Sequence, residues 1–239
     1  MKLAIISGGS RGLGAALCRQ YAEAGYEVLE FSRSAPHAFS KACDFTDPAR
    51  AASVVAETLA PFTSSPALEE IVAISNAGML APIGPVSRKA PEAVLANLNT
   101  NLASAILFMG EVVRAFQDSP ARKTLVSISS GASLKGHAGW SLYCAAKAGL
   151  DNFIRALALE QAFETSPFRA LSVDPGIMDT SMQESIRSAG KADFPTVERF
   201  IGFHRDGALR SPERIAEAIR NLVAGDAPGG ERLVAANFL

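Results

Sequence analysis

The chain begins with the stretch Leu3-Ala-Ile-Ile-Ser-Gly-Gly-Ser-Arg-Gly-Leu-Gly14, in which a short apolar run passes directly into a glycine-rich turn. Such a run is typical of a strand buried on both faces, and Ala15 to Ala24 then has helical spacing, closed by Gly25 as a C-cap. A strand, a glycine turn and a helix in this order can bind a pyrophosphate, because glycine admits it and the helix N-terminus attracts its charge. The spacing is Gly-x-x-x-Gly-x-Gly rather than the commoner Gly-x-Gly-x-x-Gly, and a plain tight turn is the alternative interpretation.

The rest of the chain alternates strands with helices. Further strands are expected at Glu27–Phe31, at Ala42–Cys43 as a short stub, at Glu70–Ser75, in a run ending at Ser130, at Phe168–Val173 and at 231–235. Helices are expected from the Asp44–Pro48 cap to about Leu59, over Pro91 to about Phe116, from Trp140 to about Phe163, and after Ser211. This order predicts an α/β fold: a doubly wound parallel sheet (Rossmann fold) in three layers, α/β/α, forming a single domain over residues 1–239.

Composition excludes several classes of protein. The 239 residues are 48% apolar and 20% charged with a formal net charge of −1, and no basic stripe interleaves with aromatic residues, so nucleic acid is not an expected partner. The three cysteines and three histidines are scattered, which favours reduced thiols and predicts no metal site. We find no signal peptide and no uninterrupted apolar stretch of about 18 residues, so we expect no membrane span and a cytoplasmic location.

A second stretch, Trp140-Ser-Leu-Tyr-Cys-Ala-Ala-Lys147, carries a candidate catalytic pair. Tyr143 and Lys147 are four residues apart, so on a helix they share a face one turn apart. The lysine charge should lower the tyrosine pKa from about 10, which would make the phenol a proton donor that also works as a base near neutral pH. Ser130, at the end of an expected strand, brings a hydroxyl toward this pair. The connector 131–139 should line a substrate cleft, with Trp140 as an aromatic wall.

The end of the second strand indicates which dinucleotide is bound. An acidic residue there would bond the free 2′-hydroxyl of NAD, whereas Arg33 in Ser32-Arg33-Ser34, together with Arg11 in the glycine turn, favours the 2′-phosphate of NADP(H). Both arginines could instead be solvated surface residues. Glu30 is an alternative acidic ligand for the ribose, but it falls inside the strand.

Other polar residues have two possible roles each. Asp44 could bond the adenine amino group or begin the following helix, and the two roles are compatible. Asn76 in Asn76-Ala77-Gly78 could lie beside a cofactor or stabilise the turn. Asn101, among apolar helix neighbours, needs a partner, which could be backbone or an active-site group. Asp174-Pro-Gly-Ile-Met-Asp-Thr180 follows a strand, and residues 178–205 are interpreted as a substrate lid.

Taken together, these residues resemble the short-chain dehydrogenase/reductase family over essentially the whole chain. The resembling elements are Ser7-Gly8-x-x-x-Gly12-x-Gly14, Asn76-Ala77-Gly78, Asn101, Ser130, Tyr143-x-x-x-Lys147 and Pro175-Gly176. Gly139 to Lys147 and Pro175 to Gln183 look like the sepiapterin reductase and bacterial benzil reductase branch, whose members are NADPH-dependent reductases of ketones and diketones. Ser7 stands where the family usually has Thr, Ser75 replaces the first Asn of Asn-Asn-Ala-Gly, and the segment after Arg33 is shortened.

The resemblance implies a role for each matching residue. Tyr143 would protonate the carbonyl oxygen, Lys147 would lower its pKa and hold the nicotinamide ribose, Ser130 would orient the substrate carbonyl, and Asn101 would bind a water linking Lys147 to solvent. Substrate contacts would come from Ser130, Trp140 and Tyr143. Contacts to NADP(H) would come from Gly8, Ser10, Arg11, Gly12, Leu13, Ser32, Arg33, Asp44, Phe45, Asn76, Ala77, Gly78, Tyr143, Lys147, Pro175, Gly176, Ile177 and Thr180.

The resemblance further implies a small carbonyl substrate (a ketone, an α-diketone or a pterin side chain) and a homodimer or homotetramer joined through the helices around Asn101 and Tyr143. Two alternatives stay open. One is a non-catalytic NADP(H)-binding regulator on the same fold, and the other is an alcohol dehydrogenase that uses NAD in the oxidative direction.

Overall fold

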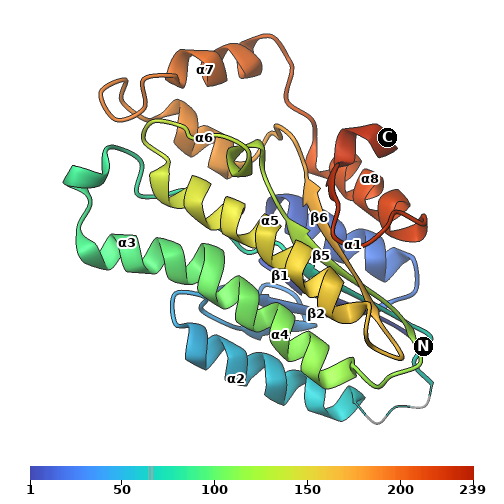
Figure 1. Ribbon diagram of the computed structural model, residues 1–239. Coiled ribbons are helices and arrows are strands. Elements are labelled where there is room, and N and C mark those ends of the chain that lie inside the picture. The colour runs from blue at the N-terminus through green and yellow to red at the C-terminus, as the bar shows by residue number, and fades with distance from the viewer. Residues whose placement is uncertain (64, 66) are drawn as a thin grey trace.

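A single parallel sheet forms the centre of the molecule (Figure 1). The structure is a computed structural model that describes residues 1–63, 65 and 67–239. In these residues seven strands pair in the order β3-β2-β1-β4-β5-β6-β7, and every pair is parallel. Their bounds are β1 Lys2–Ser7, β2 Glu27–Ser32, β3 Ser40–Ala42, β4 Glu70–Ser75, β5 Arg122–Ile128, β6 Phe168–Asp174 and β7 Arg232–Val234.

Helices cover both faces of this sheet. Their bounds are α1 Gly12–Glu23, α2 Pro48–Leu59, α3 Pro91–Leu98, α4 Ser104–Phe116, α5 Ser141–Gln161, α6 Ser181–Arg187, α7 Val197–Arg205 and α8 Pro212–Ala224. One hydrophobic core joins the sheet to α2, α4 and α5, and a second joins the opposite face to α1 and α8. The prediction of a three-layer, doubly wound parallel sheet is therefore confirmed.

The first strand is apolar at successive positions and does not alternate between apolar and polar residues. Leu3 and Ile5 enter the core on one face, while Ala4 and Ile6 enter the core on the other, and all four are 0% exposed. Because successive side chains point to opposite faces, a strand covered by helices on both sides must be apolar throughout.

Two strand boundaries differ from the sequence prediction. The third strand is Ser40–Ala42 rather than Ala42–Cys43, because Ser40, Lys41 and Ala42 are the residues that pair with β2, which ends at Ser32. The fifth strand ends at Ile128 rather than Ser130. Ser130 instead caps the short turn Gly131–Ser133 and accepts a hydrogen bond from the Ala132 amide at 3.2 Å. The serine still lies at the carboxyl edge of the sheet.

The long helical stretch Pro91–Phe116 is interrupted by a π-helical turn at Asn99–Ala103. By length and composition this stretch could cross a membrane, because an 18-residue window in it has a mean hydropathy of 1.3, although polar residues interrupt its apolar run. In this fold its apolar residues belong to the hydrophobic core, where Phe108, Met109 and Val112 are at most 1% exposed and pack against the sheet.

The segment interpreted as a lid contains α6 and α7, which lie beyond the carboxyl edge of the sheet (Figure 1). Two of its phenylalanines do not point to solvent. Phe194 is 0% exposed and Phe200 is 8% exposed, and both pack against Trp140 at the start of α5. The segment and the catalytic helix therefore share a small hydrophobic cluster of their own.

Gly14 gives a direct test of the strand–turn–helix unit. A Cβ at this position would lie 2.1 Å from the Gly8 carbonyl oxygen, a backbone atom that cannot move without opening the turn. We expect Gly14→Ala to lower the free energy of unfolding by about 1–3 kcal/mol, as overpacking does, measured by urea denaturation.

Gly202→Ala is the matched control, because a Cβ there meets nothing closer than 3.9 Å in the helix α7. Replacing a helical glycine by alanine should leave stability unchanged or raise it by up to about 1 kcal/mol. Equal stability of the two variants would contradict the tight approach of Gly14 to Gly8.

Candidate active site

The glycine turn is held in place by polar groups from β1 and β4. Ser7 Oγ accepts hydrogen bonds from the amides of Asn76 and Ala77 at 3.0 and 3.1 Å. The Asn76 Nδ2 group donates to the carbonyls of Ser7 and Gly8 at 3.2 and 2.9 Å. Asn76 thus takes the turn-stabilising role of its two candidate roles, and it brings Ala77 and Gly78 against the glycine turn.

The N-terminus of α1 has the properties of an anion site. Within the described residues no side chain caps this helix at Arg11, and its first turn contains no acidic residue. Gly12 has φ +53°, and the nearest atom to a Cβ built there is Thr180 Cγ2 at 3.5 Å. The glycine turn after β1 therefore lies close to the turn after β6, and among the described residues no side chain from another segment comes closer than 3.5 Å to the Gly12 Cβ position. This arrangement fits a pyrophosphate bound at the helix N-terminus.

The residues at the end of β2 divide into two groups. Glu30 is 0% exposed, and its carboxylate accepts hydrogen bonds from the Gly9 amide at 2.8 Å and from Ser32 Oγ at 3.1 Å. It therefore stabilises the glycine turn from inside the protein. Arg33, in contrast, is exposed at the strand end, as is Arg11 in the glycine turn. The only acidic candidate for the ribose is therefore directed into the protein, whereas the two arginines are accessible.

Three other predicted cofactor residues have side chains engaged elsewhere. Asp44 accepts from the amide and hydroxyl of Thr46 at 3.0 and 2.9 Å, which shapes its own turn before α2. Phe45 and Leu13 are 6% and 4% exposed and belong to the two cores. Both side chains therefore contribute to the hydrophobic cores.

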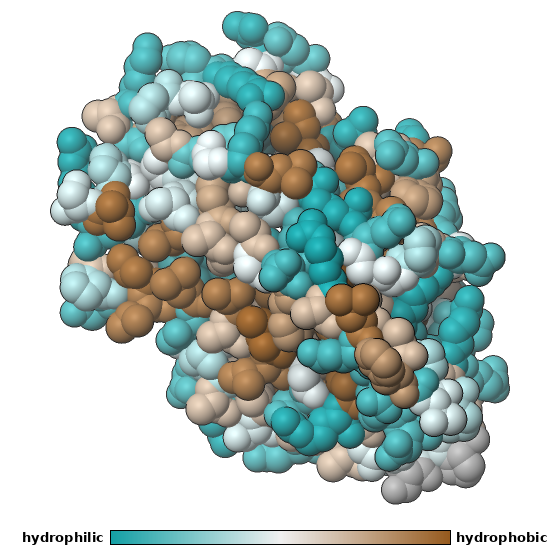
Figure 2. Space-filling model, viewed as in Figure 1, coloured by the Kyte–Doolittle hydropathy of each residue, from teal (hydrophilic) through white to brown (hydrophobic). Residues whose placement is uncertain are grey.

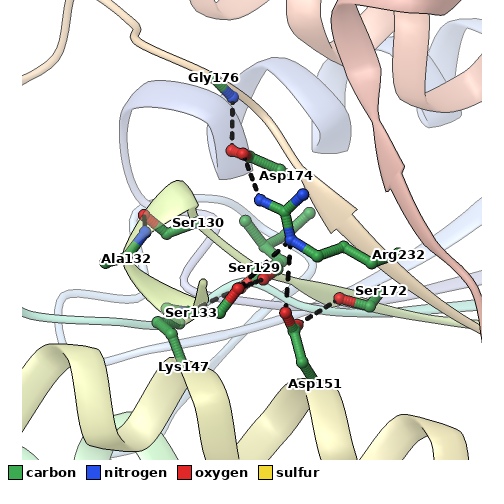
Figure 3. Close-up of polar contacts among 11 residues, drawn as sticks. Ser129, Ser130, Ala132, Ser133, Lys147, Asp151, Ser172, Asp174, Gly176 and Arg232 are labelled. Carbon is green, nitrogen blue, oxygen red and sulfur yellow. Dashed lines mark hydrogen bonds and ion pairs between the residues drawn. The ribbon is translucent and has the colours of Figure 1, made fainter. Parts of the chain in front are cut away.

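Tyr143 and Lys147 lie on one face of α5, and Ser130 lies beside them at the end of β5 (Figure 3 labels Ser130 and Lys147). The lysine Nζ is 5.6 Å from the centre of the tyrosine ring and donates to the Ile128 carbonyl at 2.6 Å. Both side chains are buried, with exposures of 8% for the tyrosine residue and 4% for the lysine. Two neighbouring segments, the turn that begins at Ser130 and the helix α5, thus bring a hydroxyl, a phenol and an amine to one place.

Burial changes the titration of this pair in a way that the sequence prediction missed. The pKa of Tyr143 is raised to about 12 by burial, and a hydrogen bond with Ser130 only partly opposes the rise. The tyrosine pKa in the protein without ligand is therefore above its usual value and not below it as the sequence suggested, because burial outweighs any lowering by Lys147. Burial also lowers the pKa of Lys147 to about 8, while the charges of Asp151 and Asp174 work against that fall. Desolvation disfavours both the phenolate and the ammonium, and it exceeds the effect of a single neighbouring charge.

Asn101 lies in the π-helical turn and is fully buried. Its Nδ2 donates to the Met79 carbonyl at 2.7 Å, and its Oδ1 accepts from the Met79 amide at 2.9 Å. The backbone therefore satisfies this side chain, which was one of the two possibilities in the sequence. The contact ties α4 to the chain just after Gly78, whose Cβ position would be 3.2 Å from Asn101 Oδ1.

Trp140 is 6% exposed and stacks on Phe194, with ring centres 4.6 Å apart and planes 7° from parallel. Its other contact with the site is edge-on, with the Tyr143 ring at 6.3 Å. The indole is thus a buried link between the lid segment and the tyrosine rather than an open wall, and a substrate could reach only an edge of it.

A group of charged residues behind Lys147 was missed by the sequence analysis. Arg232 of β7 pairs with Asp174 at 2.6 Å and with Asp151 at 3.4 Å, and Asp151 accepts from Ser172 at 2.5 Å (Figure 3). One signal was present: Asp151 follows Lys147 by four residues, so it continues the helix face of Tyr143 and Lys147. The residues next to Arg232 in the sequence give no indication that it lies near the site.

Comparisons with known proteins agree with this geometry. The family model described as short chain dehydrogenase matches residues 2–191. The chain is similar to the benzil reductase ((S)-benzoin forming) of Bacillus subtilis, 37% identical over 93% of both chains. It is similar to the sepiapterin reductase of Mus musculus, 33% identical over 66% of this chain and 60% of that one.

Among solved structures, the enzyme KRED1-Pglu superposes with a TM-score of 0.83 at 28% identity, over 97% of this chain and 100% of that one. The family model covers most of the chain, and the serine, tyrosine and lysine converge beside an open glycine turn. The chain therefore belongs to the short-chain dehydrogenase family, in the branch of the benzil and sepiapterin reductases.

Proposed function

We propose that this protein is an NADPH-dependent carbonyl reductase that acts on small ketones and α-diketones. The observation that carries the proposal is the convergence of Ser130, Tyr143 and Lys147 at the sheet edge next to the glycine turn. Members of this family are oxidoreductases that use a nicotinamide dinucleotide. The relative of 37% identity is named as a benzil reductase, which supports an α-diketone as the substrate class.

The nicotinamide, when bound, supplies the hydride, and the residues of this chain supply binding and the proton. The Ser130 hydroxyl is close enough to Tyr143 to lower its pKa, so the two hydroxyls can hold one carbonyl oxygen between them. The high pKa of Tyr143 keeps the phenol protonated and ready to donate at neutral pH. The ammonium of Lys147 lies under the ring and stabilises the negative charge that the phenol acquires when it gives up its proton.

The preference for NADPH rests on the two exposed arginines. Arg11 belongs to the glycine turn and Arg33 follows β2, so both flank the place where a dinucleotide fold holds the adenosine ribose. A guanidinium binds a 2′-phosphate through charge-assisted hydrogen bonds. The acidic alternative, Glu30, is committed to the Gly9 amide.

The same proposal includes a homo-oligomer joined through α4 and α5. Leu95 of α3 is 59% exposed and Leu107 of α4 is 38% exposed. A groove between α4 and α5 continues this apolar surface, and its lining includes Ile106, Val113 and Phe153. Figure 2 shows brown, apolar side chains gathered along the band occupied by α3 and α4. A second copy would cover this surface.

The assigned proton donor is tested by Tyr143→Phe, with benzil as substrate. Loss of the general acid should lower kcat about a hundredfold or more, while NADPH binding measured by fluorescence stays intact. Tyr26→Phe is the matched control, because Tyr26 packs against Tyr21 away from the site. Undiminished benzil reduction by the Tyr143 variant would rule out this residue as the acid, and NADPH binding without turnover in the wild type would favour a non-catalytic protein.

Cofactor preference is tested by Arg33→Ala. One lost charge-assisted hydrogen bond of about 1.5–3 kcal/mol should raise the KM for NADPH about ten- to a hundredfold and leave the KM for NADH unchanged. Arg205→Ala, which removes an exposed arginine paired with Asp206, serves as the control. Equal effects on both cofactors would refute the assignment of Arg33 to the 2′-phosphate.

The pH dependence follows from the Lys147 pKa of about 8. Below this pH the lysine is charged and supports proton donation by Tyr143; above it the charge is lost. We therefore expect kcat/KM for benzil to fall as the pH rises through about 8. A profile that stays level through this pH would contradict the role of the ammonium.

A further inference from the structure

Arg232 lies only a few residues from the end of the sequence, on a strand of three residues at the edge of the sheet. Parallel pairing of β7 with β6 aligns Arg232 with Ser172 and Val234 with Asp174. The arginine side chain runs from this edge strand across the carboxyl end of β6 toward the catalytic helix (Figure 3). Its side chain is 13% exposed, so the guanidinium is largely withdrawn from water.

The guanidinium contacts each of the three segments that carry the site. It pairs with Asp174, whose other oxygen accepts from the Gly176 amide at 2.9 Å and shapes the turn after β6. Its Nε donates to Ser133 Oγ at 3.3 Å, in the turn that begins at Ser130. The same Nε lies 3.4 Å from Asp151 Oδ2, one helical turn beyond Lys147.

The charges in this region balance. Asp151 and Asp174 have side-chain exposures of 4% and 13%, and each lies close enough to favour the charged form of Lys147. Arg232 and Lys147 supply two positive charges against these two carboxylates. Buried charges that lose a partner are costly, so the four groups are linked energetically as well as geometrically.

We propose that Arg232 is a positioning residue of the active site, which holds the serine turn, the catalytic helix and the turn after β6 in one arrangement and neutralises the two carboxylates behind Lys147. The inference rests on the proposed function for its kinetic consequences only. The electrostatic consequence belongs to the folded protein whatever its substrate is.

The sign of the electrostatic effect is determined by the groups around Lys147. The titratable groups that face it are Tyr143 and Asp151 on α5 and Asp174 on β6, and Arg232 on β7 pairs with both carboxylates. Removing the positive charge of Arg232 leaves the two carboxylates uncompensated, which favours the lysine ammonium and raises its pKa. Removing one carboxylate has the opposite effect and lowers the lysine pKa further.

The experiment compares Arg232→Gln, Arg232→Lys and Asp151→Asn with the wild type. Arg232→Gln should lower kcat about ten- to a hundredfold through misplacement and move the fall of kcat/KM to higher pH by about one unit. Asp151→Asn should move that fall to lower pH. Arg232→Lys keeps the positive charge but cannot reach all three partners. It should therefore show the wild-type pH profile of kcat/KM together with a kcat as low as that of Arg232→Gln.

A second readout does not depend on turnover. The Lys147 ammonium is titrated by NMR in the ligand-free protein with isotope-labelled lysine side chains, and Lys147→Met assigns its signal. Its pKa should rise in Arg232→Gln and fall in Asp151→Asn. If benzil is not reduced by any variant including the wild type, the proposed function fails and this titration still decides the role of Arg232.

Arg122→Gln is the matched control, because Arg122 also pairs with a buried carboxylate, Glu70, at the opposite end of the sheet. Any loss of stability is measured by thermal unfolding of every variant, and Arg122→Gln should leave the titration of Lys147 unchanged. Should Arg232→Gln fail to fold, Arg232→Lys and Asp151→Asn still carry the test. A lysine pKa that does not move in Asp151→Asn, or moves in the same direction in the glutamine and asparagine variants, would overturn the proposal.

Discussion

The carboxyl ends of all strands lie on one edge of the sheet, and every functional element of this protein depends on that constraint. Parallel pairing requires each strand to be followed by a crossover, so the chain returns to the same end before the next strand begins. The glycine turn after β1, the Asn76 turn after β4, the Ser130 turn after β5 and the Pro175 turn after β6 are consequently neighbours. Their meeting follows from topology before any side chain is considered.

Within this edge, burial is the dominant influence on chemistry. Tyr143 and Lys147 sit in an environment that disfavours charge on either, so the phenol stays protonated while the ammonium becomes easy to lose. Asp151 and Asp174 counteract the second effect, and Arg232 in turn balances them. The acid of the proposed reaction and the charge that assists it are thus set by opposing contributions from two strands and one helix.

The structure also distinguishes polar residues that are free to bind a ligand from polar residues that hold the backbone in place, although the two kinds look alike in the sequence. Glu30, Asn76 and Asn101 are polar residues beside the site, yet each is hydrogen-bonded to backbone and holds a turn or helix in place. Arg11 and Arg33 are polar residues with exposed side chains. The first group gives the site its rigid frame, and the second gives it a surface on which an anionic ligand can be recognised.

The sequence by itself determined the strands, the helices outside the lid segment, the sheet class and the edge where Ser130, Tyr143 and Lys147 lie, because these follow from periodicity and short-range spacing. It did not predict the helices α6 and α7 within the lid segment. It predicted that the fifth strand ends at Ser130, two residues beyond its end at Ile128, but the serine still lies at this edge of the sheet. Only the tertiary structure decided the direction of the Tyr143 pKa, the burial of Trp140 against Phe194, and the meeting of Arg232 with Asp151 and Asp174. Desolvation and ion pairing depend on which residues distant in the chain surround a group, and no local pattern records that.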